Sequence, residues 1–356
     1  MAEGLRSARE LVERIRFSGD TLRAGSLGNE ATTDAVASIY FRNDLEVTPE
    51  VTPDLAAQLE LVCGRLHISQ SQINAFVYAS SELQAACLAT GTSKCVLRFS
   101  SALVDLLDAE EFSFVCGHEL GHFLLGHGIA KIESRNASIE YFMQQRAQEI
   151  SVDRVGFIAC GSLDVAIRAL MKTASGLNER HLRFDVGTFV SQLNKSGSSA
   201  LINDHTASHP SILVRCRALL WFSLNDFLKT KTENSGELQL HSLDERIQHD
   251  LDRFVDGPAR RQIEDAKNDL AMWMVTYEIV QKGVFDKSAQ KIVARMFGAD
   301  TLERLRNFLK EIPAAEVEDT VYARVQTTRE ALEGLIPTGF EAELRKIQDS
   351  VSVNLK

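Results

Sequence analysis

Five residues around position 120 constrain the fold of this chain more than any others. They read His118-Glu119-Leu120-Gly121-His122, and the residues around them have the apolar spacing of a helix. On an α-helix, residues four apart lie one above the other, so the two imidazoles share one face. Two imidazoles placed in this way can bind one metal ion, and the glutamate between them can take a proton from a bound water.

The residues around this motif predict a buried helix. Asp108 can cap its N-terminus, and Glu111, three residues later, completes a capping box. Buried polar groups without partners are costly, and a metal ion would explain why a buried helix carries them. The alternative is a chance occurrence of a short pattern. The apolar residues that favour burial are Phe112, Val115, Cys116, Leu120, Phe123 and Leu124.

A catalytic zinc usually has three protein ligands, so one more ligand is needed. His127 is the nearest candidate in sequence, but on a continuous helix it lies about 140° around the axis from His122. A longer H-E-x-x-H-x-x-G-x-x-H pattern would need glycine at position 125 and histidine at position 128, where the chain has Leu125 and Gly128. We therefore exclude His127 as a ligand and expect the helix to end near it.

Glu149 is the better candidate for the third ligand. It begins a Glu-x-x-x-Asp pattern in a second helical run, roughly residues 139–159. Asp153 shares its face and could orient a ligand histidine. Gly156 continues that face and would permit the close approach of another helix. The alternative is that both carboxylates are solvated on a surface helix.

A third group of chemically active residues follows later in the chain. His209-Pro210 is typical of a loop that enters a helix, and Arg215 lies six residues after the histidine. A histidine and an arginine near a polarised carbonyl could stabilise a developing oxyanion. The alternative, an ordinary helix start with a surface arginine, is favoured by the spacing alone.

With these three motifs in order, the chain resembles the M48 family of zinc peptidases, which includes the CAAX prenyl proteases and HtpX-like peptidases. The resemblance runs from about residue 51 to 221. His118, Glu119 and His122 match the family's H-E-L-G-H, and the family's E-x-x-x-D and H-P-x-x-x-x-R are also present. It implies a gluzincin-type fold, one Zn²⁺ per chain held by His118, His122 and Glu149, and Asp153, His209 and Arg215 beside it.

The family commonly has an Asn-Ala pair on an edge strand ahead of the zinc helix, and this strand holds an extended peptide by main-chain hydrogen bonds. Asn74-Ala75-Phe76 is the best match, although the chain then departs from the family's usual glycines. The turn Gly91-Thr92 and the apolar run 95–99 predict further strands. A plain structural sheet is the alternative.

Composition excludes several classes of protein. A net charge of −10 argues against nucleic acid and against an anionic membrane surface. No apolar run is long enough to span a membrane, and the start of the chain lacks a secretion signal, so we expect a soluble, cytoplasmic form of the family. The cysteines have no paired spacing and read as reduced, buried thiols. The alternative is regulation by oxidation of Cys116, which lies close to His118.

The chain divides into three parts by composition. Residues 1–50 contain an amphipathic stretch and a polar segment, residues 51–225 form the peptidase-like domain, and residues 226–356 read as helices without a catalytic motif. The expected fold class is therefore α+β, mostly helical, with a small β-sheet and an all-helical C-terminal domain. That domain could dock a protein partner.

The leading hypothesis is a zinc-dependent endopeptidase that hydrolyses peptide or protein substrates, with Glu119 as general base. The alternative is a latent peptidase-like regulatory or binding protein that acts through its helical C-terminal domain. A purely structural zinc is disfavoured, because structural sites use four Cys or His ligands in a closed shell.

Overall fold

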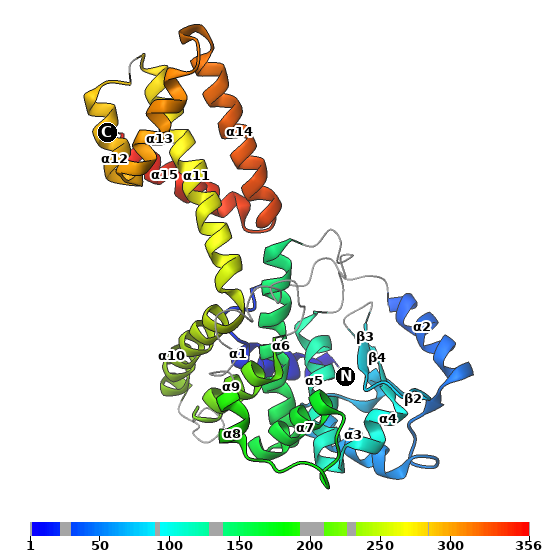
Figure 1. Cartoon of the computed structure of the whole chain (residues 1–356). Helices are drawn as coiled ribbons and strands as arrows, with labels where there is room; N and C mark the ends of the chain where they lie inside the picture. Colours follow the sequence, from blue (N-terminus) through cyan, green and yellow to red (C-terminus); the bar gives the residue numbers. More distant parts are fainter. Residues whose placement is uncertain are drawn as a thin grey trace. The chain divides into compact units, whose positions relative to one another are not determined.

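The protein consists of two compact units. The first contains residues 1–135 and 143–255, and the second contains residues 136–142 and 256–356 (Figure 1). The predicted boundary after residue 225 thus differs from this division, which places α10 (Glu233–Leu251) in the first unit. The computed structural model describes residues 2–21, 30–89, 93–127, 138–192, 210–225, 233–283 and 285–355.

The described residues are mostly helical with one small sheet, as predicted. The sheet has four strands in the order β1-β2-β4-β3. The two inner strands are parallel, and each outer strand is antiparallel to its neighbour. The predicted strand over 95–99 is confirmed as β4, whereas Gly91-Thr92 lies outside the described residues. The strands are β1 (Leu45–Glu46), β2 (Ile73–Tyr78), β3 (Ala85–Leu88) and β4 (Cys95–Ser100).

The prediction that Asn74-Ala75-Phe76 lies on an edge strand is wrong. These residues belong to β2, which pairs with β4 along its whole length. On its other side, β2 pairs with β1 at Phe76 and Val77, and Val47 N–H donates to the Ala75 carbonyl. Within the described sheet, β3 is the edge strand next to β4. Strand order depends on contacts between distant segments, which the local sequence pattern does not contain.

The helices of the first unit begin at the caps that the sequence offers. Asp108 accepts a hydrogen bond from the backbone N–H of Glu111 and completes the predicted capping box. Ser162 and Ser211 cap α7 and α9 in the same way. These helices are α1 (Ala2–Ile15), α2 (Glu30–Asn43), α3 (Pro53–Arg65), α4 (Ser101–Leu106), α5 (Ala109–Leu125), α6 (Ile139–Cys160), α7 (Leu163–Ser175), α8 (Val186–Ser191), α9 (Ile212–Ser223) and α10.

Helices α5 and α6 cross in close contact because glycines line their crossing. A Cβ added at Gly117 would lie 2.2 Å from the Cβ of Ala159, and one added at Gly156 would lie 2.8 Å from the carbonyl oxygen of Phe114. Real Cβ atoms do not approach other atoms so closely, so these positions require glycine at this helix spacing. The predicted role of Gly156 in close helix approach is therefore confirmed.

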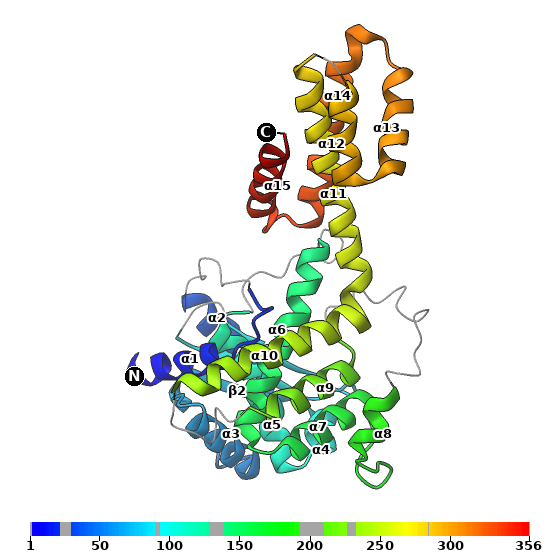
Figure 2. The ribbon, with the colours of Figure 1, turned by 90° about the vertical axis from the view of Figure 1, so that its left-hand side faces the viewer.

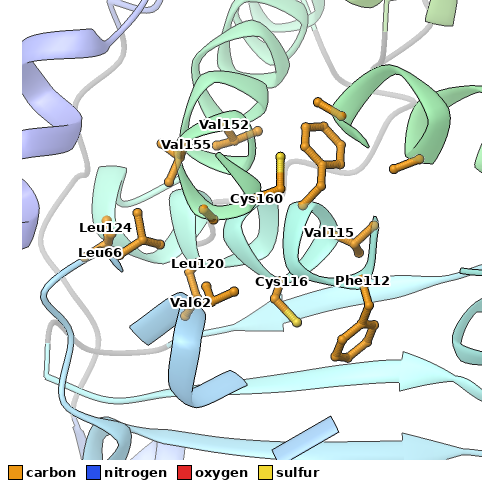
Figure 3. Packing of buried hydrophobic residues seen from close by; sticks show 14 of the residues in the cluster. Val62, Leu66, Phe112, Val115, Cys116, Leu120, Leu124, Val152, Val155 and Cys160 are labelled. Carbon is orange, nitrogen blue, oxygen red and sulfur yellow. The ribbon is translucent and has the colours of Figure 1, made fainter. Parts of the chain in front are cut away.

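The main core of the first unit surrounds this crossing. Helix α5 is buried on almost every face, because α6 covers one side while α3, α7 and the sheet cover others (Figures 1 and 3). Cys116 and Leu120 of α5 lie on the side of Val62 of α3 (Figure 3). The H-E-x-x-H motif is thereby embedded in a close-packed interior.

The second unit is all-helical, as predicted for the end of the chain. Its core contains Leu270, Val293, Leu332, Phe340 and Ile347, all less than a tenth exposed. No described helix of either unit is both long and apolar enough to cross a membrane. A five-residue π-helical turn (Asp252–Asp256) precedes α11. Its helices are α11 (Gly257–Gln281), α12 (Lys287–Phe297), α13 (Ala299–Lys310), α14 (Val317–Leu335) and α15 (Phe340–Asn354).

Candidate metal centre

The structure brings the three predicted metal ligands together. His118 and His122 project from one face of α5, and Glu149 projects from α6. One ligand atom of each lies within 4.8 Å of the others, the distances expected around a single ion. His118 Nε2 is 3.6 Å from Glu149 Oε2, and His122 Nε2 is 3.5 Å from Glu149 Oε1. Both histidines thus present the same nitrogen, Nε2, to one carboxylate.

Asp153 holds the other ring nitrogen of His118. Its Oδ1 lies 3.0 Å from His118 Nδ1, which fixes the orientation of the ring. Asp153 in turn accepts hydrogen bonds from Arg215 of α9, at 2.8 Å from Nε and 2.5 Å from Nη2. A third nitrogen of Arg215, Nη1, lies 3.4 Å from Glu149 Oε2. The guanidinium thus bridges the two carboxylates of α6. Figure 2 shows α9 alongside α7 and α10.

The charges of this group reinforce one another. Burial opposes the charged form of Glu149, but Arg215 and the histidines outweigh it and hold the pKa of Glu149 well below its ordinary value. Burial also opposes the charged form of Asp153, but Arg215 outweighs it, and the pKa of Asp153 is lowered as well. For His118, the hydrogen bond to Asp153 and the charge of Glu149 overcome burial and raise the pKa. Two carboxylates therefore stay ionised in a nearly dry site.

Sequence reasoning missed a second set of contacts, on His122. Helix α5 ends at Leu125, and Gly126 at φ 74° turns the chain so that His127 folds back toward the helix. His127 Nδ1 then lies 3.2 Å from His122 Nδ1, and its Nε2 lies 3.1 Å from Asp20 Oδ2. The angle that excluded His127 as a ligand assumed a continuous helix. The glycine after Leu125 was the signal that the chain turns there.

Glu119 lies on α5 between the two histidines and is 8% exposed. Its charge contributes to the raised pKa of Cys87 on β3, after the hydrogen bond to Cys95, burial and the charge of Cys95. Helix α5, which carries Glu119 beside the two histidines, contacts the edge strand β3. A general base in a peptidase needs this placement beside the metal.

The two residues of the late motif have different outcomes. Arg215 is in contact with the site, whereas His209 lies outside the described residues. Arg215 stands in the first turn of α9, which Ser211 caps. The predicted role of both residues at an oxyanion stays a prediction.

All six cysteines are free thiols, as predicted, and five of them are buried. Burial raises the pKa of Cys116 well above its ordinary value, and the charges of Cys63 and Glu119 add to this. A thiolate is the reactive form of cysteine, so this pKa disfavours oxidation of Cys116 as a control of the site.

Two comparisons with known proteins found matches in the region of the H-E-x-x-H helix or elsewhere along the chain. The family model described as Peptidase family M48 matches residues 49–144. The metalloprotease YcaL of Escherichia coli (strain K12) is 32% identical over 103 residues, which are 28% of this chain and 39% of that protein. No solved structure matches. The matched region contains His118, Glu119 and His122 but ends before Glu149, so the third ligand is supported by geometry. The match to the M48 family model thus covers the H-E-x-x-H helix and its surroundings.

Proposed function

We propose that this protein is a zinc-dependent endopeptidase that hydrolyses peptide bonds of protein substrates. The observation that carries the proposal is the convergence of His118, His122 and Glu149 from two helices. Two imidazole nitrogens and one carboxylate oxygen are a typical ligand set of a catalytic zinc with an open position for water. The match to peptidase family M48 supports the same reaction class.

The side chains fit zinc rather than a harder cation. Each histidine has its Nδ1 engaged by another side chain, so Nε2 remains to face Glu149 and the metal. Calcium and magnesium prefer sites made of oxygen ligands, which this group does not provide. Zinc bound here would lower the pKa of a water molecule toward about 7 and polarise the scissile carbonyl.

The chain's own residues would then share the reaction among them. Glu119 takes a proton from the attacking water and hands it to the leaving amine. Asp153 keeps the His118 ring in place, and Arg215 neutralises Asp153 and Glu149 in their buried positions. Arg215 and His209 are also proposed to stabilise the negative oxygen of the tetrahedral intermediate.

The edge strand β3 is the proposed binding edge for substrate, in place of the segment 74–76. An extended peptide can add to a free strand edge by main-chain hydrogen bonds. Helix α5, which carries Glu119, contacts β3, so such a peptide would pass close to the helix of the proposed general base. A docking role for residues 226–356 stays a prediction. The alternative of a latent regulatory protein is not favoured, since His118, His122 and Glu149 lie close enough together to hold one ion.

The decisive experiment replaces Glu119 by glutamine. Glu119→Gln removes the base but no ligand, so the variant should keep one zinc per chain and lose cleavage of an unfolded protein such as casein. Glu110→Gln is a matched control, because Glu110 is an exposed acid on the same helix. Unchanged turnover in Glu119→Gln, or a wild-type chain without zinc, would refute the proposal.

A further inference from the structure

The two histidines of the candidate metal centre are oriented in different ways. His118 Nδ1 meets the carboxylate of Asp153 directly. His122 Nδ1 meets His127 Nδ1 at 3.2 Å, and His127 Nε2 meets Asp20 Oδ2 at 3.1 Å. Both hydrogen-bond chains end at a carboxylate, but the second chain is one imidazole longer.

The positions of the protons in this second hydrogen-bond chain follow from the requirement that a metal-binding nitrogen carries no proton. His122 must keep the lone pair of Nε2, so its single ring proton is on Nδ1. That N–H donates to His127 Nδ1, which must accept and therefore carries no proton. The proton of His127 is then on Nε2, from which it donates to Asp20. An acceptor at Asp20 thus selects the tautomer of His127 that suits a metal-binding His122.

Asp20 is buried in a way that suits an acceptor. It is 1% exposed, and its Oδ2 also accepts a hydrogen bond from Ser151 Oγ of α6 at 2.7 Å. Its Oδ1 is buried without a hydrogen-bond partner among the described residues. Burying a half-satisfied carboxylate costs free energy. Stability alone would be served better by an apolar residue, so the carboxylate points to a role in the site.

We propose that Asp20 and His127 are positioning residues that hold His122 in the orientation and tautomer that bind the metal. The proposal rests on the proposed function and deepens it. It assigns part of the metal centre to the segment that follows α1, which lies before the region 49–144 matched by the family model. Neither residue touches substrate, and both act through His122.

The test measures zinc affinity of the full chain by competition with a chromophoric chelator. His127→Ala and Asp20→Ala should weaken zinc binding by about 10–100-fold, the usual effect of removing a partner of a ligand histidine. His127→Gln, whose amide oxygen can accept from His122, should recover part of the loss. Asp20→Asn keeps the shape and an acceptor oxygen, so it should weaken binding less than Asp20→Ala.

Gln144→Ala is the matched control. Gln144 of α6 makes two hydrogen bonds with Thr21, so its removal loosens the same segment without touching Asp20 or His127. The unfolding midpoint of each metal-free variant is measured beside its affinity. If Asp20 and His127 are positioning residues, their variants should bind zinc more weakly than Gln144→Ala does when the unfolding midpoints are similar.

The outcomes separate this proposal from the one before it. Wild-type affinity in His127→Ala and Asp20→Ala would overturn the positioning role while the zinc site stands. If Gln144→Ala loses as much zinc affinity as the Asp20 and His127 variants, and the losses follow the unfolding midpoints, the contact between Asp20 and His127 has only a structural role. A wild-type chain that binds no zinc would instead refute the proposed function itself.

Discussion

The two units of this protein differ most in what they bury. Among the described residues, the first unit buries a series of charged groups, including Arg146, Glu149, Asp153, Arg154 and Lys172, each 4% exposed or less. In the second unit the buried polar residues are Asp256 and Thr276. Helix packing needs no buried ions, and ions are costly to desolvate. The first unit therefore bears desolvation costs that the second mostly avoids, and Glu149 and Asp153 bear theirs at the candidate metal centre.

The two tryptophans of the chain allow each unit to be followed separately. Trp221 lies on α9 of the first unit, and Trp273 lies on α11 of the second. Multidomain proteins often unfold in more than one step, so one fluorescent probe for each unit is needed. In a Trp221→Phe or a Trp273→Phe background, the remaining tryptophan reports on one unit alone.

The largest effect is expected when one buried charge loses its partner. Asp153→Ala leaves Arg215 without its main partner and should lower the free energy of unfolding of the first unit by about 3–5 kcal/mol. Urea unfolding followed at Trp221 measures it. Asp153→Leu combined with Arg215→Met removes both charges and should recover part of the loss, because Glu149 still loses its contact with Arg215. A loss below 1 kcal/mol in Asp153→Ala would contradict the description of this unit.

An apolar deletion should dominate in the second unit. Leu332 of α14 is fully buried, so Leu332→Ala should cost about 2–5 kcal/mol through lost burial and a cavity. The loss should be seen at Trp273, while zinc affinity stays at the wild-type value. A large loss of zinc affinity would show that the second unit supports the metal centre.

Adding one methyl group should distinguish the helix contacts of the two units. Gly117→Ala pushes a Cβ into Ala159 and should cost about 1–3 kcal/mol and weaken zinc binding, because α5 and α6 must separate. In the second unit, Gly334 of α14 has open space around its Cβ position. Gly334→Ala should stabilise α14 by up to about 1 kcal/mol. Equal effects at both positions would break the comparison.

The smallest effect per ionisable group on the free energy of unfolding is expected when the pH is lowered. The pKa values of Glu149 and Asp153 are lowered in the folded, metal-free protein, so the unfolded chain binds more protons as the pH falls. Their stabilisation is present above their ordinary pKa values and is lost as the pH falls through the lowered ones. Each group contributes about 1.4 kcal/mol per unit of pKa difference.

His118 has the opposite sign. Its pKa is raised, so its stabilisation is present below its ordinary pKa and is lost as the pH rises through the raised value. In the second unit, hydrogen bonds from Lys267 and Lys346 lower the pKa of Glu343, but this group is exposed enough for solvent to screen it. Urea midpoints from pH 3 to 8 should therefore vary more at Trp221 than at Trp273, and equal pH dependence would contradict this.

Local spacing predicted the parts of the site that lie within one helix. The histidine pair of α5, its capping box and the Glu149/Asp153 pair of α6 all follow from periodicity and caps. Contacts that depend on the path of the chain were not predictable. Asp20 reaches His127 across 107 positions, and no spacing rule connects them. The interior position of 74–76 depends on the short strand β1, whose two residues leave almost no pattern.

The burial of α5 has a consequence for the history of this chain. Fourteen of its 17 residues are buried, so almost any replacement there meets a neighbouring side chain. Such a helix accepts mutations slowly, whereas the exposed faces of the second unit can change with little penalty. Sequence similarity to related proteins should therefore persist longest around α5 and decline faster elsewhere. The region that matches a protein family, residues 49–144, includes this helix.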